Sequence, residues 1–483
     1  AVLEQEGGKT CVLSWDKSDI SEDNADVVRE VPVLQMFSNF KDRYCNHTVK
    51  VGTYKSGPNK GEDKMMTVGE MWLGNPNRRQ YLALRFLPGQ PKEVGPYLNL
   101  WRGWATEPEQ GDWSLMQDHI LNVLASGNQE YASYIIRWTA WAVQNPDRPA
   151  ESVLAFQGDK GTGKGIFCSE VQKVFGQHGM AISSPDHLTG RFNSHMRDCC
   201  LLFADEVNAA NDKKAEAVLK TLVTSYEIPI EGKGANVRMG RNRLHIMMAS
   251  NEDWVVPATG DERRYAVFQV SNHRKGPEHE GYFKAIFAQM RNGGSAAMLY
   301  DLLHMDLGDW HPRRNIPQTE ALQKQKLLSL SAMDQCMLDI LDGGIVPGTH
   351  HPESANIVFS EDWGREIGLY TRMRESSPEL KVFSAQKLSA ALKALGCTPA
   401  DRHKDRRGWI FPPLEEMRNT WMKKHGPRIW AEPATTWAAV SGPSLRGSRE
   451  MTIDDMYGDS IANLESRGLW SAQLTSAPTP SLR

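Results

Sequence analysis

The chain has 483 residues, of which 40% are hydrophobic and 24% are charged. This composition is ordinary for soluble globular proteins, and the length allows two to four domains of ~150 residues each. No apolar run approaches the ~20 residues needed to span a bilayer, which argues against a membrane role. The net charge of −3 excludes attraction of nucleic acid by the whole-chain field, so any such contact has to come from local patches.

The seven cysteines are scattered and include no Cys-x-x-Cys pair. This pattern argues against a zinc site or a disulfide framework and favours a reducing, cytoplasmic location. Residues 1–8 show no secretory signal pattern. Because the first residue is Ala1 and not Met, either the initiator has been removed or the sequence is a segment of a longer chain, and both interpretations stay open.

The first hundred residues contain short apolar stretches, such as Tyr81–Leu87 and Tyr97–Trp104, broken by Gly, Pro and Asn. They predict irregular strands and loops, which we assign to a mixed β leader region over 1–104.

From Asp112 onward, apolar residues recur at helical spacing. They predict two amphipathic helices, over about 113–125 and 130–143. The Asn145-Pro146 step ends the second helix and closes a helical region over 105–150.

Strand-like apolar runs then alternate with helical stretches, at Ser152–Phe156, Cys199–Ala204 and Leu244–Ala249. This alternation predicts an α/β fold in which helices cover a parallel sheet, within a domain over 151–315.

A helical stretch over about 318–342 follows. Ser384 is expected to cap a further helix that runs to Leu395, with Gly396 as its stop.

Residues 402–411 predict a basic hairpin directly after that helix. The order suggests a winged-helix-like module, so 316–427 is assigned to a helical linker with this module. The remainder, 428–483, is rich in Pro, Ser, Thr and Gly and is expected to be a disordered tail.

A glycine-rich segment lies between the strand at Ser152–Phe156 and a predicted helix at Ile166–Phe175. It matches the phosphate-binding loop (P-loop) at its two spaced glycines and its lysine, Lys164. Glycines there let backbone N–H groups converge on phosphate oxygens, and the lysine reaches the outer phosphates. A plain glycine-rich turn is the alternative, which the flanking strand and helix disfavour. The predicted nucleotide-binding residues are Gly158, Asp159, Lys160, Gly161, Thr162, Gly163, Lys164, Gly165 and Ile166.

Gly165 stands where a Ser or Thr hydroxyl normally ligates Mg²⁺ in such loops. Phosphates, waters and a carboxylate elsewhere in the chain can hold the ion instead. That carboxylate is expected at Asp205, which with Glu206 ends the apolar run from Cys199. Asp205 is the predicted metal residue and Glu206 the predicted group that polarises the attacking water.

Two further polar motifs follow in order. Asn251 ends the strand at His245–Ser250, where an amide can contact a terminal phosphate or position water. The adjacent Arg263 and Arg264 can supply an arginine finger to a neighbouring subunit, and the sequence does not choose between them. If it occurred alone, Asn251 would be interpreted as a helix-capping residue, and the two arginines as a solvated charge pair.

Two basic segments are candidates for contact with DNA backbones. In the first, Lys233 lies between two glycines after an apolar run, which suits a hairpin tip. A solvated lysine is an equally good interpretation there. The second segment is the predicted basic hairpin at 402–411. The predicted DNA-binding residues are Lys220, Lys233, Arg402, Lys404, Arg406 and Arg407.

The four motifs around Lys164, Asp205-Glu206, Asn251 and Arg263-Arg264 resemble those of superfamily 3 helicases, in particular phage and poxvirus-type primase-helicases. The resemblance covers about 95–425. It implies an AAA+-like ATPase that uses ATP and Mg²⁺, forms a hexameric ring and translocates on single-stranded or forked DNA. In that family Lys220–Lys233 matches the segment with the DNA-contacting hairpin, and phage-type relatives often carry glycine where Gly165 stands.

The resemblance also implies a primase or polymerase partner or upstream domain, and a bacterial host cytoplasm if the protein is phage-encoded. Two rivals stay open. One is a P-loop ATPase that remodels or loads replication proteins on DNA without unwinding. The other is an initiation protein whose ATP site only switches its assembly.

Overall fold

A computed structural model of the chain divides into two compact units. Unit 1 runs from Ala1 to Ala258 and from Glu262 to Ser329, and unit 2 contains the described residues from Leu330 onward. No helix among the described residues is long and apolar enough to cross a membrane. The structure describes residues 1–6, 8–18, 29–190, 193–207, 213–231, 237–253, 255–258, 262–351, 354–403, 405–426, 428–431 and 433–438.

The centre of unit 1 is a five-stranded sheet in the order β11-β12-β15-β10-β16, in which every neighbouring pair is parallel. β10 and β15 are buried along their whole length, as expected for a parallel sheet with helices on both faces. The three strands predicted from apolar runs are therefore confirmed, each within two residues at either end. The bounds are β10 Val153–Gln157, β11 Gly179–Ile182, β12 Leu201–Asp205, β15 His245–Ser250 and β16 Tyr265–Gln269.

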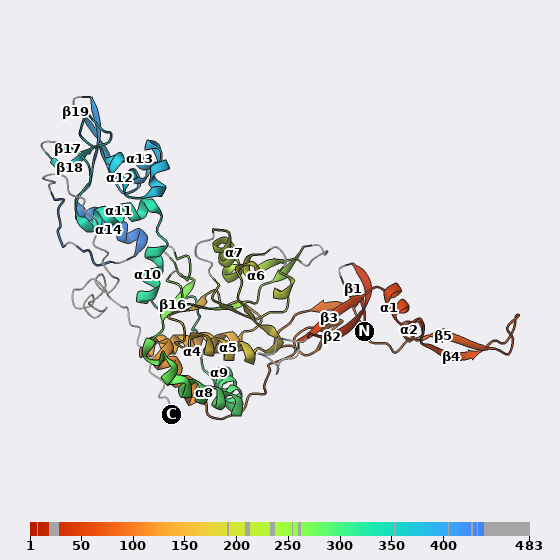
Figure 1. Cartoon of the computed structure of the whole chain (residues 1–483). Helices are drawn as coiled ribbons and strands as arrows, with labels where there is room; N and C mark the ends of the chain where they lie inside the picture. The colour runs from red at the N-terminus through yellow and green to blue at the C-terminus, as the bar shows by residue number, and fades with distance from the viewer. Residues whose placement is uncertain are drawn as a thin grey trace. The chain divides into compact units, whose positions relative to one another are not determined.

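Successive residues of these strands point to opposite faces and enter two different cores. Leu154 and Phe156 join the core that includes α4 and α5, whereas Val153 and Ala155 join the core that includes α7 and α10. In Figure 1, α4 and α5 lie on one side of the sheet and α6 and α7 on the other. The helices are α3 Ser114–His119, α4 Gln129–Gln144, α5 Lys164–Val174, α6 Pro185–Thr189, α7 Lys213–Thr224, α8 Glu280–Gln289, α9 Ser295–His304 and α10 Glu320–Leu328.

The residues before α3 form short strands, as predicted, together with two short helices that the sequence pattern did not reveal. One four-stranded sheet has the order β3-β2-β1-β6, and a three-stranded sheet the order β7-β9-β8. A further hairpin, β13–β14, lies between β12 and β15 in the sequence. The bounds are β1 Val2–Glu6, β2 Lys9–Ser18, β3 Arg29–Gln35, α1 Phe37–Arg43, β4 Thr48–Thr53, β5 Asp63–Thr67, α2 Val68–Leu73, β6 Gln80–Tyr81, β7 Ala83–Arg85, β8 Glu93–Val94, β9 Tyr97–Asn99, β13 Glu227–Ile230 and β14 Arg238–Arg241.

Among its described residues, unit 2 pairs a four-stranded sheet, β17-β18-β20-β19, with four α-helices and a short 3-10 helix. Ser384 caps α13 by accepting a hydrogen bond from the Lys387 N–H at 3.3 Å, and Gly396 follows the helix with φ +87°, as predicted. The predicted hairpin is β19–β20. The bounds are α11 Ala332–Gly343, β17 His350–His351, β18 Ser354–Phe359, α12 Leu369–Glu375, α13 Ala385–Ala394, β19 Thr398–His403, β20 Arg406–Ile410 and α14 Leu414–His425.

The single helical stretch predicted over 318–342 is wrong in one respect, because it is two helices, α10 and α11. Ser331 caps the second by accepting a hydrogen bond from the Asp334 N–H at 3.1 Å. Of the predicted tail, 439–483 lies outside the described residues. Part of 428–438 packs within unit 2, where the Trp437 Nε1–H donates to the Pro412 carbonyl at 2.7 Å.

Three histidines are buried in unit 1 as neutral imidazoles. His178 Nδ1 hydrogen-bonds the Asp198 carbonyl at 2.8 Å, and its Nε2 accepts from the Arg102 N–H at 3.0 Å, which requires an unprotonated Nε2. Burial lowers the pKa of His119, His178 and His245 to about 4 from the usual 6.5. The unfolded chain therefore binds more protons than the folded chain between these two values.

We predict that these histidines do not lower the free energy of unfolding of unit 1 above pH 6.5. The free energy of unfolding should fall as the pH drops towards 4, because the unfolded chain takes up protons that the buried imidazoles resist. Each histidine contributes on the order of 3 kcal/mol to this loss. Urea unfolding followed by tryptophan fluorescence across this range measures it. His245→Phe should remove about a third of the pH dependence, since three histidines contribute similar amounts, whereas His304→Ala, on an exposed site, should leave it unchanged. A flat wild-type profile would contradict the prediction.

Candidate functional site

The ends of three parallel strands meet at one edge of the central sheet. The register pairs Gln157 of β10 with Ser250 of β15, and Asp205 of β12 with Ala249 of β15. Beyond the strands, the Gly158 N–H donates to the Ser250 carbonyl at 3.2 Å. Open α/β sheets bind ligands at the carboxyl ends of their strands, so this edge is the expected place for a site.

The glycine-rich loop connects β10 to α5 at this edge. Gly161 has φ +82° and Gly163 has φ +89°, backbone conformations that side chains disfavour. The buried Thr162 hydroxyl donates to the Asp159 carbonyl at 2.9 Å and closes the loop from within. α5 begins at Lys164, so its free N–H groups face the loop.

The buried His119 side chain contacts the backbone of the glycine-rich loop. Its Nε2 lies 3.1 Å from the Gly163 carbonyl oxygen, which can only accept, so Nε2 carries the proton. Nδ1 is then an acceptor for the Tyr282 hydroxyl at 3.2 Å. A π-helical turn at Ile120–Leu124 follows directly, and such turns are frequent at functional sites. The sequence pattern placed His119 on a helix but gave no sign of this role.

The Lys164 ammonium faces the two acidic residues at the end of β12. Burial lowers the pKa of Lys164, and the charges of Glu206 and Asp205 oppose this effect. Burial and the neighbouring Glu206 raise the pKa of Asp205, and Lys164 opposes that shift. Lys164 Nζ also donates to the Asp159 carbonyl at 3.3 Å, which leaves further donor positions for a ligand.

Glu206 has a strained backbone, with φ +55° in a residue other than glycine. Its N–H donates to the Ala249 carbonyl at 2.8 Å, and its carboxylate accepts from Asn251 Nδ2 at 3.3 Å. The structure thus brings together Lys164, Asp205, Glu206 and Asn251, as the motif order predicted. Strain of this kind is maintained chiefly at functional sites.

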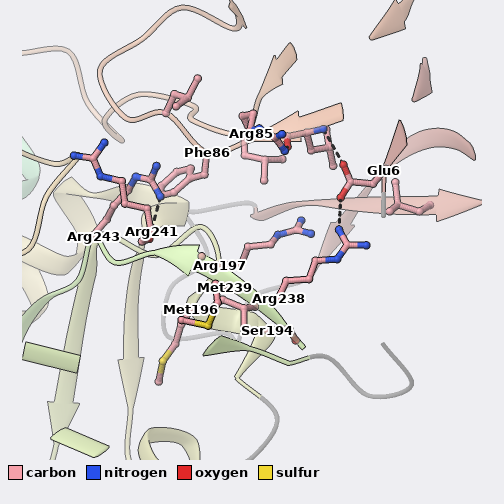
Figure 2. Close-up of a pocket in the computed structure, with 16 residues that line it drawn as sticks. Glu6, Arg85, Phe86, Ser194, Met196, Arg197, Arg238, Met239, Arg241 and Arg243 are labelled. Atoms are coloured by element: carbon pink, nitrogen blue, oxygen red, sulfur yellow. Dashed lines mark hydrogen bonds and ion pairs between the residues drawn. The ribbon is translucent and has the colours of Figure 1, made fainter. Parts of the chain in front are cut away.

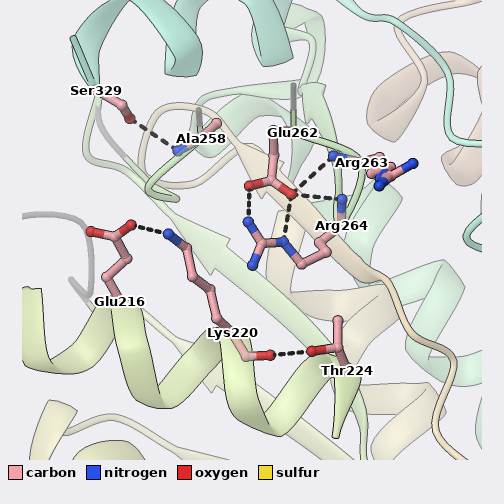
Figure 3. Close-up of polar contacts among 8 residues, drawn as sticks. All are labelled: Glu216, Lys220, Thr224, Ala258, Glu262, Arg263, Arg264 and Ser329. Atoms are coloured by element: carbon pink, nitrogen blue, oxygen red, sulfur yellow. Dashed lines mark hydrogen bonds and ion pairs between the residues drawn. The ribbon is translucent and has the colours of Figure 1, made fainter. Parts of the chain in front are cut away.

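The two predicted arginines differ in their surroundings (Figure 3). The guanidinium of Arg264 is held by Glu262 in a bidentate pair, with Nε–Oε1 at 2.7 Å and Nη2–Oε2 at 2.5 Å. The Glu262 side chain is 1% exposed and also accepts from the backbone N–H of Arg263. Arg263 itself is exposed. Glu262 directly precedes the two arginines in the sequence, but only the structure shows its role as their anchor.

The position of Gly165 leaves room for a side chain. A Cβ there would meet only Phe203 Cζ, at 3.9 Å, so packing does not enforce the missing hydroxyl. The described residues contain no cluster of three or more His, Cys, Asp or Glu side chains arranged for a metal. A divalent ion at this edge would therefore need ligands from a bound molecule and water in addition to Asp205.

The remaining loop residues point outward. Lys160 is exposed, and Asp159 is paired with Lys275 at 2.7 Å and accepts from Asn272 Nδ2 at 3.2 Å. These contacts hold the pKa of Asp159 below its usual range. Lys275 and Asn272 follow β16 in an irregular segment, and no spacing in the sequence pointed to them.

The predicted DNA contacts do not form one group. Lys220 lies on α7 and pairs with Glu216 of the same helix (Figure 3). Arg406 is held by Glu366 and lies over the Phe359 ring at 3.7 Å, whereas the two other described arginines of its hairpin are exposed. Those two are Arg402 and Arg407, and the predicted Lys233 and Lys404 lie outside the described residues.

Comparison with known proteins finds a matching family and a phage relative for part of the chain. Residues 156–264 match a family of unknown function, DUF5906. Over 168 residues the chain is 28% identical to the DNA primase-polymerase of Nitratiruptor phage NrS-1, a match that covers 34% of this chain and 23% of that protein. An apo structure of the NrS-1 C-terminal region covers 80% of this chain and 92% of its own, with a TM-score of 0.55 and 15% identity. A second, A-form apo structure of that region covers 72% and 91%, with a TM-score of 0.53 and 16% identity.

The chain is thus homologous over part of its length to a phage primase-polymerase, and its fold is that of the NrS-1 C-terminal region. The sequence match spans less than a quarter of the relative. The DUF5906 match contains the loop at Gly158, the acidic pair Asp205-Glu206, Asn251 and the Arg263-Arg264 pair. The residues gathered at the sheet edge therefore lie within the segment that matches this family.

We predict that Gly163→Ala lowers the free energy of unfolding by about 2 kcal/mol more than Gly161→Ala. Both substitutions strain a left-handed residue, at about 1–2 kcal/mol each. At Gly163 the new Cβ would also lie 2.6 Å from Phe283 Cε1 and 2.8 Å from His119 Cε1, whereas at Gly161 nothing lies within 4 Å. Denaturant unfolding of the two variants measures the difference. Equal losses would show that His119 and Phe283 do not confine the loop.

Proposed function

We propose that the chain binds and hydrolyses a nucleoside triphosphate, with ATP as the expected substrate, and uses the reaction to translocate on DNA as a helicase of the superfamily 3 type. The observation that supports this most is the arrangement at the sheet edge. A lysine, two carboxylates and an amide from three separate strand ends face one glycine-rich loop.

The loop residues fit a triphosphate. The glycines at 161 and 163 free the backbone N–H groups of the loop to converge on phosphate oxygens, and the N-terminal end of α5 adds a positive potential. Lys164 is largely buried yet keeps donors free for the outer phosphates. Mg²⁺ bound by Asp205, phosphate oxygens and water would neutralise phosphate charge during transfer.

Hydrolysis then assigns distinct tasks to the polar groups. The Glu206 carboxylate accepts a hydrogen bond from the attacking water and orients it, while Asn251 fixes that carboxylate through its 3.3 Å hydrogen bond. Lys164 stabilises the negative charge that develops on the outer phosphate oxygens. His119 acts indirectly: it is a positioning residue that hydrogen-bonds the Gly163 carbonyl of the loop.

Arg263 is the better candidate for the arginine finger. Arg264 is committed to Glu262, and its removal would leave a buried carboxylate without its main partner. Arg263 is exposed while its backbone is fixed by the same Glu262, so its guanidinium can reach a second subunit. A finger that acts across subunits requires an interface between two copies of the chain, and a hexameric ring is the assembly we propose.

The DNA-contacting elements of this proposal are the β13–β14 hairpin and unit 2, interpreted as a winged-helix-like module. On the β19–β20 hairpin the exposed Arg402 and Arg407 are available to phosphate groups. The partial homology to a phage primase-polymerase supports a role in replication beside a primase or polymerase activity.

We predict that Lys164→Ala lowers ATP hydrolysis by about 10²-fold or more, because the charge that stabilises the outer phosphates is lost. Glu206→Gln should lose hydrolysis to a similar extent while keeping nucleotide affinity, since only water activation is removed. Phosphate release and binding of a fluorescent ATP analogue measure the two effects. Lys284→Ala, an exposed lysine on α8, is the control.

Both variants should also fail to separate the strands of forked DNA substrates that the wild-type protein unwinds. Near wild-type turnover in Lys164→Ala would refute the site. Hydrolysis by the wild-type protein without strand separation on forks of either polarity would instead favour the remodelling ATPase.

We predict that an inactive Arg263→Ala protein regains hydrolysis when mixed with Lys164→Ala protein. In mixed rings some interfaces combine an intact loop with an intact arginine, so turnover per chain should be highest in an equimolar mixture and should rise with total protein concentration. Arg291→Ala, an exposed arginine elsewhere in unit 1, should hydrolyse normally without mixing. The absence of rescue, with concentration-independent wild-type turnover, would indicate a site complete within one chain.

A further inference from the structure

A cavity of about 600 Å³ lies in unit 1 between the N-terminal strands and the β13–β14 hairpin (Figure 2). Its walls come from segments far apart in the sequence, and none of its lining residues belongs to the glycine-rich loop. The residues that the argument uses are Glu6, Arg85, Arg197, Arg238, Arg241 and Arg243.

The cavity carries a strong positive charge. Five of its lining residues are arginines, and Glu6 is the one carboxylate among the residues that line it. Both Glu6 oxygens are already used, because Oε2 accepts from the Leu84 N–H at 2.9 Å and Oε1 from Arg238 at 3.3 Å. The residues that line the cavity therefore leave most of its positive charge uncompensated, which favours a bound polyanion.

Several guanidinium groups remain available to a ligand. Arg197 and Arg238 are exposed, and Figure 2 shows the Arg238 guanidinium beside Glu6. Arg241 is 3.8 Å from Asp147, a distance at which an exposed pair contributes little. Arg243 is more enclosed, and its Nε is buried without a hydrogen-bond partner in the described part of the chain. Arginine forks of this kind match phosphate oxygens in pairs.

Side-chain contacts hold the segments that carry Arg197 and Arg243. The Asn193 side chain accepts from the Glu231 N–H at 2.8 Å and donates to the Pro229 carbonyl at 2.7 Å, which fixes the Arg197 segment to the hairpin. Phe86 packs on the buried His178 ring, with centroids 5.0 Å apart, and Arg243 lies 5.3 Å from the Phe86 centroid. A preorganised cluster loses little entropy on binding.

Exposed apolar side chains border the charged groups. Met239 is 60% exposed and Leu34 is 42% exposed, and both line the cavity. Free phosphate would use only the arginines. A ligand that alternates phosphates with flat apolar rings would use both kinds of surface, and single-stranded nucleic acid has this chemistry.

We propose that this arginine cavity binds the phosphate backbone of a single nucleic-acid strand, with bases against the apolar rim at Met239 and Leu34. The inference rests on the proposed function for its biological setting, but binding here requires no hydrolysis. The strand would run along the base of the β13–β14 hairpin. This places the N-terminal strands of the chain at the nucleic-acid path, a role that no motif in them suggests.

The test is fluorescence anisotropy with a fluorescein-labelled oligothymidylate, without nucleotide, on the full chain. Arg197→Gln/Arg241→Gln should weaken binding about tenfold and reduce the slope of log affinity against log salt by about 1.4, because two phosphate contacts are lost. The charge-matched control Arg291→Gln/Arg314→Gln, exposed sites outside the cavity, should keep both affinity and slope. An unchanged slope in the cavity variant would overturn the proposal.

A second variant keeps every arginine. Met239→Asp introduces a negative charge at an exposed rim position and should weaken strand binding without changing the unfolding midpoint. Inorganic phosphate and adenosine monophosphate should compete only weakly, and an oligoglutamate of equal charge should not displace the strand. Displacement by the monophosphate at equal affinity would make this a mononucleotide site, and displacement by the oligoglutamate would make it a peptide site; either result overturns the proposal.

Lys164→Ala separates this inference from the proposed function. Strand binding should persist in that variant, while the arginine variants keep basal ATP hydrolysis. Near wild-type hydrolysis in Lys164→Ala, with intact strand binding, would count against the sheet-edge site alone. Intact hydrolysis with strand binding that ignores the arginines would count against the cavity alone.

Discussion

The parallel pairing of β10, β15 and β12 is the constraint on which the rest of the structure depends. Parallel strands end at the same edge, so the register that pairs Gln157 with Ser250 and Asp205 with Ala249 also brings the following loops together. Because the three strands are almost entirely buried, a one-residue slip would exchange their two faces between the two cores. The hydrophobic cores thereby fix the positions of Lys164, Glu206 and Asn251.

Buried polar side chains then hold the loops that the strands bring together. His119 holds the glycine-rich loop, and Glu262 holds the Arg263-Arg264 segment. Gln325, fully buried on α10, accepts from the Val255 N–H at 2.7 Å and donates to the Asp253 carbonyl at 2.7 Å, which anchors the segment after Asn251. Each anchor satisfies backbone groups that would otherwise be buried without partners.

The sequence predicted the parts of this site that depend on local pattern. Apolar runs located β10, β12 and β15, and glycine spacing located the loop, because both features are set by neighbours along the chain. The anchors could not be predicted in this way. His119 is 44 residues from Gly163 in the chain, and its partner Tyr282 lies further still, so only the tertiary fold brings them together.

The partners of charged residues could not be predicted from the sequence for the same reason, because the tertiary fold determines them. Lys220 and Arg406 were predicted as DNA-binding residues, and in the fold each has an acidic partner, Glu216 and Glu366. Conversely, the arginine cavity draws on strands and loops up to 237 residues apart, Glu6 and Arg243 being its extremes. Charge runs are visible in a sequence, whereas charge clusters built from single residues on different elements are not.

The central claim is that the sheet edge is a triphosphate site, and a crystal structure of the chain with Mg²⁺ and a slowly hydrolysed ATP analogue tests it most directly. The account predicts phosphate density within hydrogen-bond reach of the loop N–H groups from Gly161 to Gly165 and of Lys164 Nζ, with Asp205 and Glu206 facing the outer phosphate. Nucleotide density bound elsewhere on the chain, with this edge unchanged, would contradict it.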